Sequence, residues 1–275
     1  MDARKKSRGK SIKDNWTVKM IDELSANHNY HLIIVSVPHY SIKEAVNYLS
    51  SRVGKATVLF FCNFWKEPLD EIAILPQEQL VWGFPKAGGG FDKSGKLIGA
   101  FLDKVTFGTF GKAPTERHKE VIQLFQSAGF KTKENNDFRS WLFKHFIFIA
   151  SLQLEALKDF NGTPPSEQFK STYFWKNAKL NSKELMLLLK ARNVDLTVPS
   201  ELGFFALPSW VIKFIMKMGM TFSPPLKRSL DFHTNPYELK AFCNDVWQSG
   251  NDFNINLERF EDGKLFFQEK LAGTI

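Results

Sequence analysis

The clearest hydrophobic pattern in the first half of the chain predicts a strand, a helix and a second strand. Apolar runs at 32–37 and 57–63 suit strands that are buried on both faces, as in a parallel sheet covered by helices. Between them, residues 41–49 have helical spacing, and a serine followed three residues later by a glutamate predicts a capping box. Asn63 follows the second strand, at the edge where open α/β sheets bind their ligands.

The rest of the first half continues this α/β pattern. Its expected elements are a strand at 79–84, a glycine-containing loop at 85–90, an antiparallel extension at 96–101 and 104–110, a helix at 115–128 that ends at Gly129, and a strand at 130–133. We therefore predict an α/β domain over residues 1–134.

The second half has mainly helical spacing and little strand signal. The expected helices are 138–159, 181–192, 209–218 and 236–249. Asn181 with Glu184 predicts a capping box, and Asn235 precedes a proline at the first helical position. The predicted fold class is α/β plus all-α, with a helical substrate or dimerisation domain over residues 135–275.

Composition indicates a globular protein without a nucleic-acid surface. The 275 residues are 43% hydrophobic and include 27 phenylalanines. The net charge is +8, but residues 1–20 account for +5 of it, which predicts a basic N-terminal arm. Cys62 and Cys243 lack the spacing of a metal site, and two such thiols favour a reducing, cytoplasmic compartment.

The most apolar segment, 141–157, could be mistaken for a membrane span. It contains Lys144, His145, Gln153 and Glu155, so we predict a buried core helix instead.

Four short segments resemble a known enzyme family. YHLIIVSVPHYSIKEAVNYL, TVLFFCNFW, LVWGFPKAGGG and DFRSWLFKHF are similar, in order and spacing, to the ketopantoate reductases (2-dehydropantoate 2-reductases). The resemblance is strongest between about residues 30 and 160. It implies an N-terminal Rossmann domain that binds NADP, a helical domain, and reduction of a small-molecule keto acid. A homo-oligomer, a dimer, is the expected assembly.

The sequence departs from this family at its phosphate-binding turn. A dinucleotide rests its pyrophosphate on a glycine-rich turn at a helix start, and no G-x-G-x-x-G occurs in the sequence. We therefore expect a partial, N-terminally truncated Rossmann-like domain that binds NADPH poorly. Such a domain would leave the strand at 32–37 as an exposed apolar edge, which the N-terminal segment, a partner chain or an upstream portion of a longer protein would cover.

The resemblance assigns cofactor contacts to a few residues. Asn63 matches an asparagine close to the nicotinamide, although a strand-ending turn residue is the alternative. Pro38 and His39 stand where the family has a cofactor-contacting lysine. Arg4 or Arg8 matches the arginine at the 2′-phosphate, or else belongs to the basic arm.

The family's catalytic lysine, in a W-x-K pattern, falls on Lys144 or His145, depending on the register. Helical spacing places Lys144 on a stripe with Ser151 and Glu155, which we interpret as solvated surface. The same spacing points His145 inward, on the face of Ile149. A histidine can donate a proton to a developing alkoxide, while a hydrogen-bonded core histidine is the alternative.

The family's two asparagines follow the lysine by four and eight residues. From the histidine these positions are Ile149 and Gln153, and from the lysine they are Phe148 and Leu152, so neither register restores the polar cluster.

Two residues further along match substrate contacts of the family. Ser223 matches a serine that hydrogen-bonds the substrate, or is a loop serine before two prolines, and Thr234 lies eleven residues later. The active-site glutamate falls on Asn235, for which a helix cap is the other interpretation. Two functions follow: an impaired NADPH-dependent reductase of a 2-keto acid, or a non-catalytic remnant that acts by protein association.

Overall fold

The computed structural model describes residues 19–91, 94–159, 163–231 and 235–268. Arg4, Arg8 and Thr234 lie outside the described residues. Contacts divide the chain into two compact units. The sheet unit is Met1–Lys86 with Phe101–Phe138, and the helical unit is Ala87–Ala100 with Arg139–Ile275.

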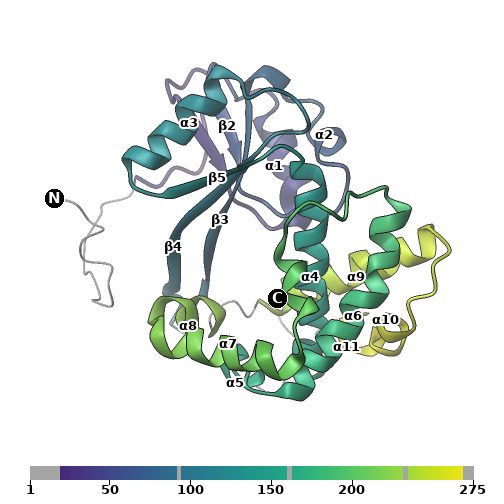
Figure 1. Ribbon diagram of the computed structural model, residues 1–275. Coiled ribbons are helices and arrows are strands. Elements are labelled where there is room, and N and C mark those ends of the chain that lie inside the picture. Colours follow the sequence, from purple (N-terminus) through teal and green to yellow (C-terminus); the bar gives the residue numbers. More distant parts are fainter. Residues whose placement is uncertain (1–18, 92–93, 160–162, 232–234, 269–275) are drawn as a thin grey trace. The chain divides into compact units, whose positions relative to one another are not determined.

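The sheet has five strands in the order β1-β2-β3-β4-β5 (Figure 1). The strands are β1 (Leu32–Val35), β2 (Thr57–Phe60), β3 (Leu80–Phe91), β4 (Leu97–Gly108) and β5 (Lys131–Asn135). β1, β2 and β3 are parallel to one another, and so are β4 and β5. The connection from β3 to β4 is too short for a crossover, so these two strands form a hairpin and the sheet is mixed.

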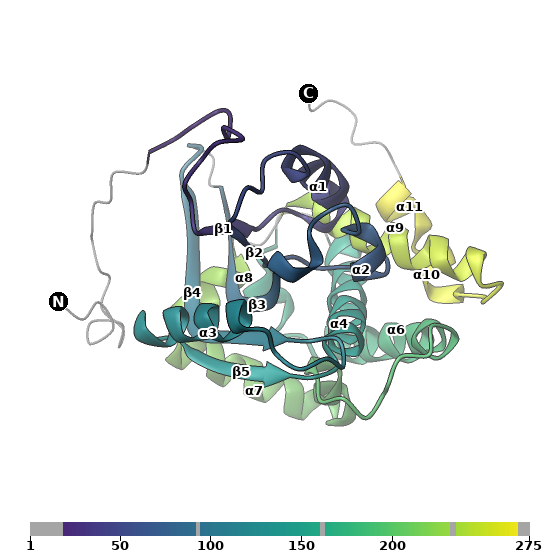
Figure 2. The ribbon, with the colours of Figure 1, turned by 90° about the horizontal axis from the view of Figure 1, so that it is seen from above.

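The strand register shows which side chains share a face of the sheet. Leu59 of β2 pairs with Val81 of β3, and both side chains are fully buried. The helix α3 (Glu116–Ser127) packs Val121 onto this face, and α1 (Ile42–Leu49) lies on the other side of the strands (Figure 2). The short helices of this unit are α2 (Pro68–Glu71), η2 (His39–Ser41) and η3 (Gln77–Gln79).

The start of α1 differs from the prediction. Ser41 occupies the N-cap position, but its side chain accepts no capping hydrogen bond. Its backbone (φ −102°, ψ 1°) lies outside the extended region that aims a cap at the helix, because the 3-10 turn η2 leads directly into α1. By contrast, Thr115 is extended, and its hydroxyl accepts a hydrogen bond from the backbone N–H of His118 at 3.2 Å. The capping box predicted at Ser41 is therefore wrong, and the start predicted for α3 is confirmed.

The glycine run predicted as a loop lies within β3. A Cβ atom at Gly89 would lie 2.5 Å from the carbonyl oxygen of Ile98, and one at Gly99 would lie 2.6 Å from that of Gly88. Side chains would prevent this close approach of the two backbones, so the glycines allow the hairpin to form.

The helical unit contains the predicted helices and several shorter ones. They are α4 (Phe138–Lys158), α5 (Pro165–Gln168), α6 (Thr172–Ala191), η4 (Glu201–Ala206), α7 (Ser209–Phe222), α8 (Pro224–Asp231), α9 (Pro236–Asp252), α10 (Glu258–Asp262) and α11 (Lys264–Gln268). An aromatic cluster around Trp175, Phe174 and Phe205 forms part of the core. In the described part of the chain, no helix is both long and apolar enough to cross a membrane.

The helix α6 begins nine residues before the start predicted at Asn181. Ser171 caps it, since its hydroxyl accepts from the backbone N–H of Phe174 at 3.3 Å. Asn181 lies inside the helix, is fully buried, and hydrogen-bonds side chains of other helices. The pattern of a helix start at Asn181 was therefore misleading, because its polar side chain serves tertiary contacts.

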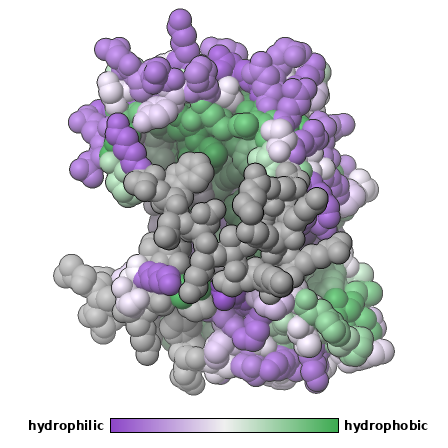
Figure 3. All heavy atoms as spheres, turned by 90° about the vertical axis from the view of Figure 1, so that its left-hand side faces the viewer, coloured by the Kyte–Doolittle hydropathy of each residue, from purple (hydrophilic) through white to green (hydrophobic). Residues whose placement is uncertain are grey.

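The predicted apolar edge is present among the described residues. β1 is the outermost strand, and its Ile34 is 49% exposed on the face that carries Leu59. Phe101 and Leu124, both of the sheet unit, are about half exposed as well. Figure 3 shows apolar side chains gathered on one face of the sheet unit, with polar residues above them and at their sides.

Candidate functional site

The carboxyl ends of β1 and β2 lie side by side and carry a buried amide. The Cys62 thiol donates to the carbonyl oxygen of Val35 at 3.3 Å, which joins the two strand ends. Asn63 follows, and its Oδ1 is buried with no hydrogen-bond partner among the described residues. Since buried acceptors almost always have a donor, this oxygen fits the N–H of a ligand amide such as a nicotinamide carboxamide.

The described residues offer fewer contacts for the pyrophosphate of a dinucleotide. His39 is buried after β1, and its ring meets Tyr40 edge-on at 5.4 Å. The turn between β1 and α1 contains no glycine, so it offers no cradle for a pyrophosphate. Among the described residues, these strand ends therefore offer one unbonded amide oxygen and a turn without glycine.

The prediction that Lys144 lies on a solvated stripe of its helix is wrong. It is only 5% exposed, and its Nζ donates to the carbonyl oxygen of Leu196 at 2.7 Å and to that of Val198. Ser151 and Glu155, on the same stripe, are buried too. The prediction failed because α4 is covered around most of its circumference, which helical periodicity cannot reveal.

His145 is buried, as the helical spacing predicts, and is held by two neighbours. Its ring stacks on Trp141, with the ring centres 5.0 Å apart and the planes at 10°. Its Nδ1 lies 3.3 Å from Oε2 of Glu201, which belongs to η4. A carboxylate at one imidazole nitrogen fixes the orientation of the ring. Nothing local in the sequence pointed to Glu201, because it is 56 residues away.

A small cavity lies along the same face of α4. Its volume is about 110 Å³, and its walls include Ile149 and Gln153, the positions four and eight residues after His145. Gln168 of α5 also lines it, and its buried Oε1 has no hydrogen-bond partner in the part of the chain that the structure describes. The cavity is therefore mostly apolar, with the amide side chains of Gln153 and Gln168 in its walls.

Ser223 and Asn235 are both used at helix starts. The Ser223 hydroxyl accepts from the backbone N–H of Leu226 at 3.4 Å, at the beginning of α8. Oδ1 of Asn235 accepts from the backbone N–H of Tyr237 at 3.1 Å, which confirms the interpretation of Asn235 as the cap of α9.

Comparison with known proteins reveals a shared fold. No family model and no curated protein matches the sequence. A D-mandelate dehydrogenase solved with NADH and anilino(oxo)acetate matches 90% of this chain and 77% of its own, with a TM-score of 0.62 and 12% identity. A putative ketopantoate reductase from Ralstonia solanacearum matches 90% and 80%, with a TM-score of 0.62 and 13% identity. A dimeric ketopantoate reductase from Staphylococcus aureus matches 87% and 76%, with a TM-score of 0.56 and 10% identity.

These matches run across most of the chain, and at such identities they show the fold alone. The expected fold, a Rossmann-like sheet followed by a helical region as in ketopantoate reductases, is confirmed.

Proposed function

We propose that this chain reduces a 2-keto acid to a 2-hydroxy acid with NADPH, and that it does so weakly as the chain stands. The observation that carries the proposal is the pairing of His145 with Glu201, which favours His145 over Lys144 as the proton donor. The ammonium group of Lys144 is already bonded to two backbone carbonyls. The fold supports the same chemistry, since a protein of this fold was solved with NADH and anilino(oxo)acetate.

Each residue has a defined part in this proposal. NADPH, when bound, supplies the hydride that the keto carbon accepts. Asn63 would hold the carboxamide of NADPH by accepting a hydrogen bond through Oδ1, and His39 lies at the neighbouring strand end. Protonated His145 gives its proton to the keto oxygen, and Glu201 holds the ring in position. Ser223 and Asn235 remain proposed substrate contacts, and Arg4 a proposed contact of the 2′-phosphate.

The test is NADPH oxidation with a panel of 2-keto acids. The loss of nicotinamide absorbance is the readout, and the protein concentration is high. We expect slow turnover that His145→Gln reduces at least ~100-fold, since general acid catalysis contributes roughly that much. Glu201→Gln should reduce it less, and Lys190→Gln, on the exposed side of α6, should leave it unchanged. Turnover that persists in His145→Gln would refute the assigned acid.

The affinity for the cofactor is tested separately. Without a glycine-rich turn, we expect no resolved rise in melting temperature at about 1 mM NADPH, because stabilisation needs a ligand concentration near or above Kd. A clear rise would show that other residues of this chain hold the phosphates.

A second function is favoured by the apolar edge of the sheet unit. β1 is an edge strand that carries the half-exposed side chain of Ile34, and such an edge invites pairing with another chain. We propose that the chain forms a homodimer through β1, whether or not it is active. Sedimentation should show a dimer that Ile34→Lys dissociates, while Leu187→Lys, on exposed α6 surface, should not. A monomer at all concentrations would contradict this.

A further inference from the structure

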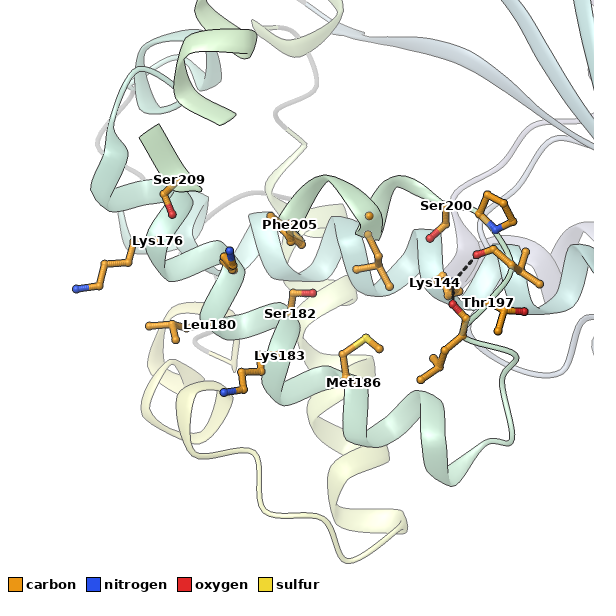
Figure 4. A pocket seen from close by; sticks show the side chains of 16 residues that line it. Lys144, Lys176, Leu180, Ser182, Lys183, Met186, Thr197, Ser200, Phe205 and Ser209 are labelled. Carbon is orange, nitrogen blue, oxygen red and sulfur yellow. Dashed lines mark hydrogen bonds between the residues drawn. The ribbon is translucent and has the colours of Figure 1, made fainter. Parts of the chain in front are cut away.

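A second cavity of the helical unit has no part in the proposed reduction step. Its volume is about 800 Å³, within the range of small-molecule sites. α6 forms one wall, the loop 196–200 and η4 form the other, and Ser209 of α7 closes one end (Figure 4). The bonds from Lys144 to the carbonyl oxygens of Leu196 and Val198 fix the loop, so the wall is formed in advance.

Every charged side chain that lines this pocket is positive. Four lysines line it, and none of its described lining residues is acidic. Lys176, Lys179 and Lys183 follow one another at helical spacing, which places them on one face of α6. None of the three forms an ion pair with a described carboxylate, and only the Nζ of Lys179 is bonded, to the carbonyl oxygen of Leu207 at 3.0 Å. An anion would therefore meet uncompensated positive charge.

Two hydroxyl groups in the pocket have no partner within the described structure. Ser182 is 5% exposed, forms no hydrogen bond to any described side chain or backbone group, and points into the pocket (Figure 4). The Oγ of Ser200, on the facing wall, is buried and equally unbonded among the described residues. Buried hydroxyls are normally satisfied, so the unbonded Ser200 hydroxyl fits an oxygen atom of a ligand, which the Ser182 hydroxyl can also meet.

Most of the remaining lining is apolar. Leu180, Met186, Leu202 and Phe205 contribute side chains, and Phe205 belongs to the aromatic core of the unit. Lysines along one face of α6, two hydroxyl groups and apolar side chains together suit a molecule with one anionic end and an apolar body. We propose that this pocket binds an amphipathic organic carboxylate, a function that goes beyond the proposed reductase and requires no cofactor.

The experiment is calorimetric titration of the full chain with decanoate. Two comparison ligands separate the contributions: decanol has the tail without the charge, and butyrate has the charge with little tail. We expect decanoate to bind most tightly and its affinity to fall as salt rises. The double variant Lys179→Glu with Lys183→Glu should weaken binding at least about tenfold, as loss of two attractive charges implies.

Controls keep the outcome decisive. Lys190→Glu lies on the same helix outside the pocket and should leave decanoate binding unchanged. Should the double variant lose its helical circular dichroism, Lys183→Gln replaces it, because the exposed Lys183 side chain makes no described hydrogen bond. His145→Gln should bind decanoate normally, which separates this pocket from the proposed reaction. Equal affinity for decanol and decanoate, or unchanged binding in a folded charge variant, would overturn the proposal.

Discussion

Replacement of Asn181 by alanine should destabilise the helical unit strongly. Asn181 is fully buried in α6 and joins it to two other helices. Its Nδ2 donates to the carbonyl oxygen of Ser151 at 3.1 Å and to Oε1 of Glu155 at 2.9 Å. Its Oδ1 accepts from Nε of Arg259 at 2.6 Å. Alanine would remove all three bonds and leave a buried carboxylate and a guanidinium short of partners.

The magnitude follows from the kind of bond that is lost. A hydrogen bond to a charged group contributes about 1.5–3 kcal/mol and a neutral one about 1 kcal/mol. Glu155 keeps its ion pair with Lys158 at 3.1 Å, and Arg259 keeps its bond to Asn177 at 3.0 Å, so the loss falls short of the full sum. We expect Asn181→Ala to lower the free energy of unfolding by about 3–5 kcal/mol.

The assay must report on the helical unit, since the two compact units need not unfold together. Native-state hydrogen exchange of the α6 amides provides this, because it measures the free energy of opening segment by segment. Asn47→Ala, at an exposed position of α1, is the control and should change stability by less than about 0.5 kcal/mol. A loss below about 1 kcal/mol for Asn181→Ala would refute the view that these bonds hold α4, α6 and α10 together.

Three further predictions concern the rest of the chain. Burial lowers the pKa of His118 below 6.5, so the unfolded chain binds more protons at this residue and the free energy of unfolding decreases as pH falls below 6.5. His118→Gln should make the free energy of unfolding, measured between pH 7 and 4, depend less on pH. An unchanged pH dependence would contradict this. Gly89→Ala should destabilise the hairpin by about 1–3 kcal/mol in denaturant unfolding, since the new Cβ would lie 2.5 Å from the carbonyl oxygen of Ile98, whereas Gly203→Ala meets open space and should be neutral or slightly stabilising. Burial raises the pKa of Cys62 to about 12, so a thiol reagent at pH 8 should label it only after denaturant is added, and rapid labelling of the native protein would contradict its burial.

Features that depend on residues close in sequence were predicted correctly more often than features that depend on distant residues. Strands at the start of the chain, the cap at Thr115 and the cap at Asn235 were predictable, because each signal acts within a few residues. The cap at Ser41 failed for a related reason: a 3-10 turn before the helix changed the backbone conformation of the serine, and the two-residue pattern does not encode that turn.

The sequence by itself determined the order of elements, the change from α/β to helical character and the resemblance to ketopantoate reductases. Tertiary structure alone decided which polar side chains are buried and with whom: Lys144 against loop carbonyls, His145 beside Glu201, and Asn181 between three helices. It also decided that the glycine run, expected as a loop, is the part of β3 whose backbone lies closest to β4. The physical reason is that periodicity and capping depend on neighbours in sequence, whereas burial and hydrogen-bond partners depend on segments brought together only by folding.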